Sequence, residues 1–400
     1  MHVLFVHQNY PAQFGHIAAH LARHHGYRCT FVSERPPANE GGVERIQYKI
    51  RSGATAATHY CSRTFENATW HAHAVFEALK ARPDIRPDLV VGHSGFGSTI
   101  FLKELYDVPI INYFEYFYRT VDSDMDFRPD FPCEEIDRLR ARARNAMLLL
   151  DLENCDLGHS PTTWQRDRLP GAFRDKVRVV FDGVDTALWR PTPGPRKVGG
   201  RSIGPGTRVV SYVARGMESM RGFDKFMEMA HIVSCRRADV LFVVVGQDRV
   251  CYGGDARHLG GKTFKEWVLG RGNYDLGRFL FTGLLPPTEL ASLFSITDLH
   301  VYLTVPFVLS WSLMDALACG ATVLGSDTGP VREMIREGEN GLLTDFFDVE
   351  AMADRVCAVL DAPGDYRLLG VAGVEMIRED YSLGVCLPLL MNLYGEAIAG

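Results

Sequence analysis

Residues 303–343 read LTVPFVLSWSLMDALACGATVLGSDTGPVREMIREGENGLL, and this stretch decides what kind of fold and site we expect. An apolar run ends at Leu303, and a helix is expected to begin at Ser310 or Ser312. The N-terminus of such a helix offers free N–H groups and a positive dipole end to an anion. Asp315, one turn inside the helix, can accept hydrogen bonds from a sugar diol. The same window also fits an ordinary buried helix between two strands.

Outward from this window, strands and helices alternate along the chain. Apolar runs separated by helix-period segments cover 3–6, 29–32, 89–91, 109–113 and 177–181, and the pattern restarts over 208–213, 240–245, 279–282, 299–303 and 322–324. Such alternation is typical of βαβ units and parallel sheets. We therefore expect an α/β protein of two doubly wound, Rossmann-like domains that face each other across a cleft.

The domain boundaries follow from composition. Residues 191–206, PTPGPRKVGGRSIGPG, are dominated by glycine and proline and are the best linker candidate. This places an N-terminal domain at residues 1–190 and a C-terminal domain at residues 207–382. Residues 383–400 are expected to pack back onto the first domain.

The overall composition excludes some classes of function. The chain has 400 residues, of which 46% are hydrophobic and 23% charged, as in a folded globular protein. Its net charge of −6 argues against a nucleic-acid partner, which requires a basic surface. The 9 cysteines contain no CxxC pair, which favours reduced thiols and a cytoplasmic location. We see no signal-peptide pattern and no apolar run long enough to span a membrane, so any membrane contact would be peripheral, at the inner face.

Two arginines follow the first strand of the second half. Arg215 and Arg221 lie in the segment ARGMESMRG, before a helix-period segment, and could clamp a diphosphate with charge-assisted hydrogen bonds. Solvated loop arginines are the alternative. No GxGxxG follows the first strand and no GxxxxGK[ST] occurs, which argues against a dinucleotide-binding fold and a P-loop hydrolase.

Two patterns suggest metal sites without meeting their requirements. The alternating aspartates of residues 122–126 could begin an EF-hand loop, but Phe127 and Cys133 stand where glycine and glutamate are needed. We interpret the acidic, aromatic segment 119–135 as a wall or lid of a binding site beside Glu115. The histidines at helical spacing within residues 16–24 are interpreted as a half-buried helix face. We expect neither a metal nor a cofactor.

Several motifs in order resemble glycosyltransferase family 4, whose members are retaining enzymes of the GT-B fold. The motifs are FDGVD at 181–185, the two arginines, FTG at 281–283, the window from 307 to 333, and ENGL at 339–342. HQNYP at 7–11 and SPTTWQ at 160–165 resemble a bacterial subset of the family with an NxPxxF…SPTxWQ pattern. The resemblance implies a metal-independent, retaining, hexosyltransferase-type enzyme of bacterial glycan, glycolipid or glycoconjugate synthesis.

On the donor side, the resemblance assigns the diphosphate to Arg215 and Arg221 and the ribose to Asp315. The backbone near Gly283 and Leu284 would lie beside the base. The first glutamate of the family signature falls on Phe307, followed by Val308, Leu309 and Ser310. Because phenylalanine cannot accept a hydrogen bond, we expect the Ser310 hydroxyl and the backbone N–H groups of residues 308–310 to take over part of that role, or the donor sugar to be less polar at that edge.

On the acceptor side, the resemblance assigns three positions. Gly15 would let a helix N-terminus approach the donor phosphate. His93 stands in place of the family's HxH histidine, and Glu115 stands where many relatives carry a histidine beside the transferred sugar. A satisfied core histidine and a structural ion-pair partner are the respective alternatives.

Three functions therefore remain open from the sequence. The leading one transfers a sugar from a nucleotide-diphosphate sugar to a glycan, lipid-linked, protein or small-molecule acceptor. The others are a nucleotide-sugar epimerase or hydrolase on the same scaffold, and a catalytically silent binding module. The donor base and sugar, the acceptor and the oligomeric state are not specified by the sequence.

Overall fold

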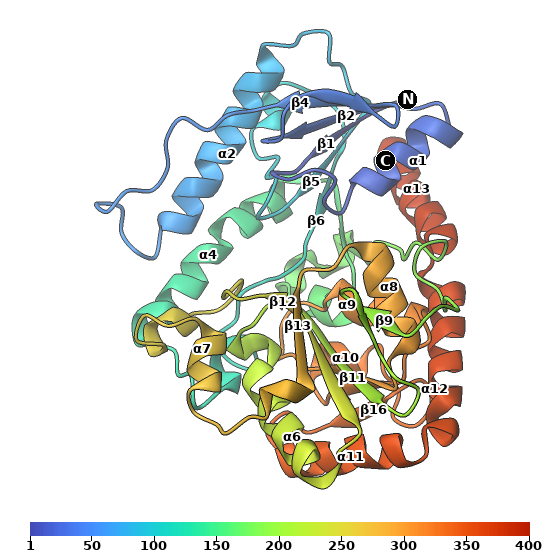
Figure 1. The fold of residues 1–400 in the computed structure, drawn as a ribbon. Helices are drawn as coiled ribbons and strands as arrows, with labels where there is room; N and C mark the ends of the chain where they lie inside the picture. The colour runs from blue at the N-terminus through green and yellow to red at the C-terminus, as the bar shows by residue number, and fades with distance from the viewer. The chain divides into compact units, whose positions relative to one another are not determined.

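The computed structural model describes residues 1–400, which form two compact units. Unit 1 comprises residues 1–120, 134–182 and 386–400, and unit 2 comprises residues 121–133 and 183–385. Each unit is built on a largely parallel sheet flanked by helices (Figure 1). None of the helices combines the length and the apolar character needed to cross a membrane.

Unit 1 contains an eight-stranded sheet in the order β3-β4-β2-β1-β5-β6-β7-β8, in which only the β3–β4 pair is antiparallel. Its strands are β1 (His2–Val6), β2 (Arg28–Ser33), β3 (Ala38–Glu40), β4 (Val43–Gln47), β5 (Leu89–His93), β6 (Ile110–Tyr113), β7 (Leu157–Ser160) and β8 (Val177–Val179). Its helices are α1 (Gly15–His24), α2 (Arg63–Lys80), α4 (Glu135–Asn154), α5 (Thr163–Asp167) and most of α13 (Leu383–Ala399), with 3₁₀ turns η1 (Leu102–Glu104) and η2 (Gly171–Lys176).

The fully buried strand β1 shows how this sheet is covered on both faces. Leu4 and Val6 belong to one core cluster with residues of α2 and α4. Phe5 points the other way, and its ring contacts Phe14, next to α1, and Tyr394 of α13. Because successive side chains of a strand alternate between the two faces, an unbroken apolar strand requires helices on both sides.

Unit 2 contains a parallel six-stranded sheet in the order β13-β12-β11-β14-β15-β16. Its strands are β11 (Arg208–Gly216), β12 (Val240–Gln247), β13 (Phe279–Gly283), β14 (Leu299–Tyr302), β15 (Val323–Ser326) and β16 (Leu342–Thr344), with a small hairpin of β9 (Lys197–Val198) and β10 (Arg201–Ser202). Its helices are α3 (Asp124–Phe127), α6 (Phe223–Arg236), α7 (Phe264–Leu269), α8 (Pro287–Ile296), α9 (Trp311–Ala318), α10 (Gly329–Arg332), α11 (Val349–Asp361) and α12 (Pro363–Met376). Shorter turns are η3 (Ser219–Arg221), η4 (Asp255–His258), η5 (Leu276–Arg278) and the π-helical η6 (Ile377–Tyr381).

The core of unit 2 follows the same alternation. Val210 and Tyr212 of β11 and Phe242 of β12 lie in one buried cluster with Phe223 and Phe226 of α6. The strands β11, β12 and β14 run side by side, so their C-terminal ends lie along one edge of the sheet. Loops from this edge carry the site described below.

The linker expected at residues 191–206 is not the boundary between the units. The transition lies between Asp182 and Gly183, and residues 191–206 belong to unit 2. Gly199 and Gly200 both adopt positive φ, 52° and 82°, and form the turn between β9 and β10. Glycine-rich composition here marks a hairpin turn rather than a flexible connection. Residues 386–400 group with unit 1, where Arg178 forms an ion pair with Glu396 of α13.

The acidic segment between β6 and α4 also differs from the expectation. Residues 121–133 belong to unit 2, so they are not a wall of the unit that contains β6. Asp126 accepts hydrogen bonds from the backbone N–H groups of Asp122 and Ser123, which caps α3. The aspartate pattern thus serves a helix cap, and no group of three or more His, Cys, Asp and Glu side chains in the structure could hold a metal ion.

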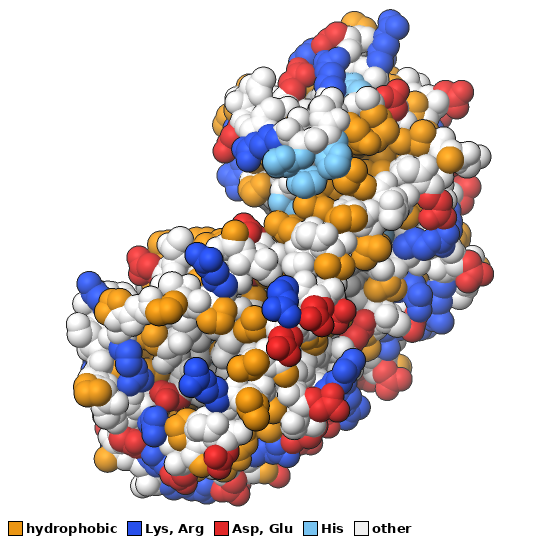
Figure 2. Space-filling view, turned by 90° about the vertical axis from the view of Figure 1, so that its right-hand side faces the viewer, with side chains coloured by type: hydrophobic (Ala, Val, Ile, Leu, Met, Phe, Trp, Pro, Cys, Tyr) orange, Lys and Arg blue, Asp and Glu red, His pale blue; other side chains and the backbone are white.

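Histidines gather on the surface of unit 1 (Figure 2). The ring of His20 lies 4.9 Å from that of His24 and 5.2 Å from that of His25, at the C-terminal end of α1. His16 instead lies 2.7 Å, through Nε2, from the carbonyl oxygen of Asp182. Within α1, His20 and His24 therefore contact each other, whereas His16 contacts Asp182.

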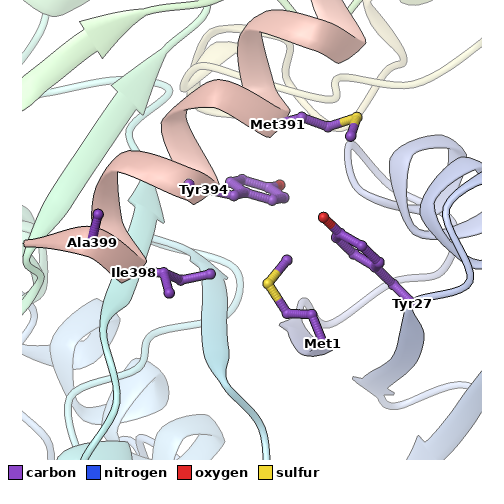
Figure 3. Close-up of a pocket in the computed structure, with 7 residues that line it drawn as sticks. Met1, Tyr27, Met391, Tyr394, Ile398 and Ala399 are labelled. Atoms are coloured by element: carbon purple, nitrogen blue, oxygen red, sulfur yellow. The ribbon is translucent and has the colours of Figure 1, made fainter.

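A pocket of about 250 Å³ lies in unit 1, beside α13 (Figure 3). It is lined by Met1, Tyr27, Met391, Tyr394, Gly395, Ile398 and Ala399. The rings of Tyr27 and Tyr394 project toward one another across it. Because no basic side chain lines this pocket, it offers nothing to neutralise a phosphate.

Candidate functional site

The loop between β14 and α9 contains most of the residues expected on the donor side. Ser310 is the N-cap of α9, and its hydroxyl accepts the N–H of Ser312 at 3.4 Å. The N–H of Ser310 donates to the hydroxyl of Tyr302 at 2.9 Å. This backbone group is therefore already used inside the protein, which contradicts the expectation that it is available to the donor sugar.

Arg221 forms hydrogen bonds with this loop. Its guanidinium is buried and donates to Thr304 Oγ1 at 2.8 Å and to the carbonyl of Val308 at 3.3 Å. It forms no ion pair with any carboxylate. The buried Glu218 interacts with it electrostatically but makes no direct ion pair, so an anion bound beside Arg221 would still be stabilised. Arg221 and Val308, both expected on the donor side, are thus in contact.

Phe307 lies in the same neighbourhood. Its ring lies 5.5 Å from that of Tyr252, and the guanidinium carbon of Arg221 lies 5.8 Å from the Phe307 ring centre. The position of the missing glutamate is therefore filled by an aromatic wall beside the arginine. Leu309, next along the loop, is half-buried.

Asp315 lies on α9 with its side chain half-buried. Its carboxylate accepts no hydrogen bond and forms no ion pair in the structure. Burial raises the pKa of Asp315 well above its usual range. A carboxylate left unpaired at a helix start is a site where a diol could donate two hydrogen bonds.

Arg215 is exposed at the end of β11, where the next residue, Gly216, pairs with Gln247 of β12. Its exposed position contrasts with the burial of Arg221. The two arginines therefore differ in burial.

A pocket of about 480 Å³ lies at the C-terminal ends of β12 and β13. Its lining comprises Met217, Gly246, Gln247, Asp248, Lys265, Phe281, Gly283 and Leu284. Two residues expected beside the base, Gly283 and Leu284, therefore do line a pocket. Gly283 has a φ of 69°, which favours glycine, while the space around its Cβ position is empty.

Sequence reasoning missed Lys265 in this pocket. Its ammonium group lies 4.1 Å from the ring centre of Phe281, so it is held as a cation–π pair. Lys265 belongs to α7, which is distant along the chain from the strand ends, and no motif marks it. Only the fold places it beside β13.

In unit 1, His93 and Glu115 lie close together at the ends of β5 and β6. Nε2 of His93 is 3.9 Å from Oε2 of Glu115. Nδ1 of His93 donates to the carbonyl of Ser94 at 2.9 Å, which leaves Nε2 as an acceptor in the neutral ring. Burial, with His7 nearby, keeps the pKa of His93 well below its usual value. The two residues assigned to the acceptor side are thus neighbours.

Three further polar residues lie at the same edge, of which only His7 belongs to a motif named from the sequence. The His7 ring lies 5.0 Å from that of His93, and the Tyr113 ring lies 4.8 Å from His93 and 4.9 Å from His159. The hydroxyl of Tyr113 donates to Asp182 at 3.3 Å. Each of these three rings lies in the last two residues of a parallel strand or directly after it, which is the signal that could have identified them.

The loop after β5 is fixed by a buried carboxylate of α4. Asp151 accepts hydrogen bonds from the hydroxyls of Ser94 and Ser98, each at 2.8 Å. Burial raises the pKa of Asp151 to about 6. The loop that begins at His93 is therefore held by α4 rather than free.

Gly15 begins α1, but the structure gives another reason for the glycine. A Cβ at this position would lie 2.3 Å from Cβ of Pro11, and the Gly15 N–H donates to the Pro11 carbonyl at 2.7 Å. This N–H is therefore occupied by the preceding turn. The glycine is required by close packing, whatever its role toward a phosphate.

Comparison with known proteins places these sites in a family. The profile described as "Glycosyl transferase family 4 group" matches residues 25–189, and that described as "Glycosyl transferases group 1" matches residues 201–373. D-inositol 3-phosphate glycosyltransferase of Corynebacterium glutamicum is 25% identical over 96% of this chain and 90% of its own. Alpha-maltose-1-phosphate synthase of Mycolicibacterium smegmatis is 26% identical over 58% of this chain and 59% of its own, so that match spans little more than half of either protein.

Solved structures give the same result for the fold. Sucrose-phosphate synthase of Thermosynechococcus elongatus superposes with a TM-score of 0.75, at 17% identity, over 100% of this chain and 99% of that one. The Anabaena protein HepE superposes with a TM-score of 0.67, at 13% identity, over 100% of this chain and 99% of that one. These likenesses confirm the expected fold class, two Rossmann-like domains of the GT-B type. With both sequence profiles matched in order, the chain is a glycosyltransferase and belongs to family 4.

Proposed function

We propose that this glycosyltransferase binds a nucleoside-diphosphate sugar in unit 2 and transfers the sugar, with retention at the anomeric carbon, to a hydroxyl bound by unit 1. The observation that carries the proposal is the buried guanidinium of Arg221, which has no ion-pair partner and adjoins the start of α9. HepE, whose fold this chain shares, has been solved with UDP-glucose, which supports a donor of this class.

Different residues of unit 2 would bind the diphosphate, the ribose and the base of the donor. Arg221, with the exposed Arg215, would stabilise the charge that develops on the departing diphosphate, so the reaction would require no metal and no cofactor. Asp315 would accept hydrogen bonds from the ribose hydroxyls. The pocket at Gly283 and Leu284 would hold the base, with Lys265 at its side.

The residues of unit 1 would handle the acceptor. His93 offers a neutral acceptor nitrogen and Glu115 a carboxylate, a pair suited to orienting a hydroxyl. The leaving phosphate oxygen would take the hydroxyl proton as the new bond forms on the same face. The relatives named for D-inositol 3-phosphate make a phosphorylated polyol the first acceptor to test. If the acceptor is lipid-linked, we propose that the enzyme is cytoplasmic and contacts the inner membrane face peripherally, which vesicle flotation would reveal.

The test is a thermal-shift screen with UDP, GDP, ADP and their sugar conjugates, repeated in Arg221→Met and in the control Arg237→Met. Ligand binding raises the melting temperature by mass action, so a nucleoside diphosphate should raise Tm in the wild type and the control but not in Arg221→Met. No shift with any nucleotide would contradict the proposal.

A second measurement separates the three functions. The nucleotide sugar that binds in the thermal-shift screen is used as the donor. Release of its nucleoside diphosphate is measured with and without D-inositol 3-phosphate and other acceptors. Release that requires an acceptor identifies a transferase. Release without an acceptor indicates a hydrolase, while conversion of the sugar without release indicates an epimerase, and neither reaction indicates a silent binding module.

A further inference from the structure

Arg128 lies outside the residues assigned above, in the segment 121–133 that the chain inserts between β6 and α4. Its side chain is buried and donates five hydrogen bonds, the full capacity of a guanidinium. Nε and Nη2 bind the carboxylate of Asp130 at 2.9 and 2.5 Å. Nη1 and Nη2 bind the carboxylate of Asp224 at 3.1 and 2.6 Å, and Nη1 also donates to the carbonyl of Ser219 at 2.9 Å.

Two of these acceptors, Ser219 and Asp224, lie on either side of Arg221 in the sequence. Ser219 begins η3, which ends at Arg221, and Asp224 lies in the first turn of α6. Gly222 between them has a φ of 60°, and a Cβ there would lie 2.8 Å from Cβ of Leu303. Arg128 therefore clamps the two ends of the tight turn that presents Arg221.

The other polar groups of Ser219 are also fixed. Its N–H and its hydroxyl donate to the carboxylate of Asp255 at 2.7 and 2.6 Å. The preceding residue, Glu218, accepts the N–H groups of Cys251 and Tyr252 at 2.6 and 2.8 Å. The turn is thus held by two separate segments, Arg128 and residues 251–255, and of these only Arg128 bonds both of its ends.

Aromatic rings keep Arg128 in place. Its guanidinium carbon lies 4.9 Å from the ring centre of Phe131 and 5.2 Å from that of Phe346. Phe131 in turn contacts the rings of Phe264 and Trp267, on α7. In Figure 1 the teal segment accordingly runs beside α7. A planar, fivefold donor between two rings is a role that lysine, with three donors and no plane, cannot fill.

We propose that Arg128 is a positioning residue for the donor diphosphate, because it holds η3 in the conformation in which Arg221 meets the diphosphate. This rests on the proposed function in one respect, the diphosphate as the ligand of Arg221. Buried ion pairs are often replaceable by apolar packing without loss of stability, so stability alone does not account for this arrangement. A mispositioned charge, by contrast, lowers binding and turnover strongly.

The experiment compares Arg128→Met and Arg128→Lys with Arg237→Met. Arg237 is the matched control, because it binds the carboxylate of Asp239 at 3.1 and 2.9 Å at the opposite, C-terminal end of α6. Affinities for UDP, GDP and ADP are measured by calorimetry. Amide hydrogen exchange is measured in the peptide spanning residues 217–226.

We expect the affinity for the nucleotide that binds the wild type to fall at least tenfold in Arg128→Met, to fall less in Arg128→Lys, and to stay within twofold in Arg237→Met. Exchange in residues 217–226 should accelerate at least tenfold in Arg128→Met and not in the control. If Arg128→Met does not fold, Arg128→Lys and Asp224→Asn decide the question by the same two measurements.

Unchanged affinity together with unchanged exchange in a folded Arg128 variant overturns the positioning role. So does an equal loss of affinity in Arg237→Met, because a general destabilisation then explains the result. If the wild type binds none of the three nucleotides, the proposed function fails, and the exchange measurement still shows whether Arg128 orders η3.

Discussion

Nε2 of His93 lies 3.9 Å from Oε2 of Glu115, at the ends of two neighbouring parallel strands of unit 1. The histidine is fully buried and the glutamate half-buried, so this pair presents a carboxylate backed by a neutral ring. We expect Glu115→Gln to lower kcat by about tenfold or more, because the amide cannot orient or polarise a hydroxyl as a carboxylate does. Nucleotide affinity should stay unchanged, since donor binding is assigned to unit 2. Steady-state kinetics with separate nucleotide titrations test this, and a loss confined to nucleotide affinity would contradict it.

Phe307→Glu should not restore the family signature. The new carboxylate would lie beside the buried guanidinium of Arg221 and give it an ion-pair partner within the protein. We expect nucleoside diphosphate affinity to fall about tenfold, because the charge that attracts the diphosphate is then neutralised. Phe307→Leu is the control for lost aromatic packing. Higher turnover of Phe307→Glu on hexose donors would contradict this expectation. It would show that a carboxylate at position 307 is sufficient to improve binding of the donor sugar.

Asp315→Asn should separate stability from ribose binding. Burial raises the pKa of Asp315 in the folded protein above its pKa in the unfolded chain. As the pH rises from the unfolded-state pKa toward the folded-state pKa, the free energy of unfolding therefore falls. The asparagine variant should therefore be as stable as the wild type or more stable at neutral pH. It should bind the nucleotide more weakly, whereas the 2′,3′-dideoxynucleotide should bind both proteins alike. Equal losses for both ligands would exclude contact between Asp315 and the ribose.

His159→Phe should reduce the decline in the free energy of unfolding at acidic pH. Both ring nitrogens of His159 are buried without a hydrogen-bond partner, and burial lowers its pKa to about 4. A histidine with a lowered pKa contributes stability above its unfolded pKa near 6.5, and this stability is lost as the pH falls toward 4. The loss amounts to about 3 kcal/mol across that window. Urea unfolding at several pH values should show a smaller decline in the variant than in the wild type or in the exposed control His73→Phe.

Gly15→Ala distinguishes packing from phosphate binding at the start of α1. The new Cβ would overlap Pro11, so we expect the free energy of unfolding to fall by about 1–3 kcal/mol. Nucleotide affinity, measured well below Tm, should not change if the glycine serves packing alone. A weakened affinity in the folded variant would instead support the role that the family resemblance assigns to this residue.

Local chemistry was enough to predict several features of the site. The apolar runs predicted two parallel sheets. Ser310 or Ser312 was expected to begin the helix, because a hydroxyl there satisfies a free N–H, and the structure has Ser310 as the N-cap. Asp315 is expected from its place one turn inside that helix, whereas the family resemblance assigns His93 and Glu115. The resemblance also assigns Gly283 and Leu284, and both line the pocket beside β12 and β13.

Other features depended on contacts between distant parts of the chain. No pattern places Lys265 beside Phe281, or Arg128 between Phe131 and Phe346. The glycine-rich stretch at 191–206 was misread because the same composition makes both linkers and hairpin turns. The acidic segment, interpreted as an acceptor-side wall or lid, groups instead with unit 2, because its contacts are with residues far along the chain.

The sequence by itself determined the two Rossmann-like sheets and the family, because hydrophobic period and motif order are properties of neighbouring residues. The tertiary structure decided that Arg221 is buried without a direct ion-pair partner and that Asp315 is left unpaired. It also decided that segment 121–133 supports the turn before α6. Burial and pairing are set by residues far apart along the chain, so their electrostatic consequences appear only once the fold is complete.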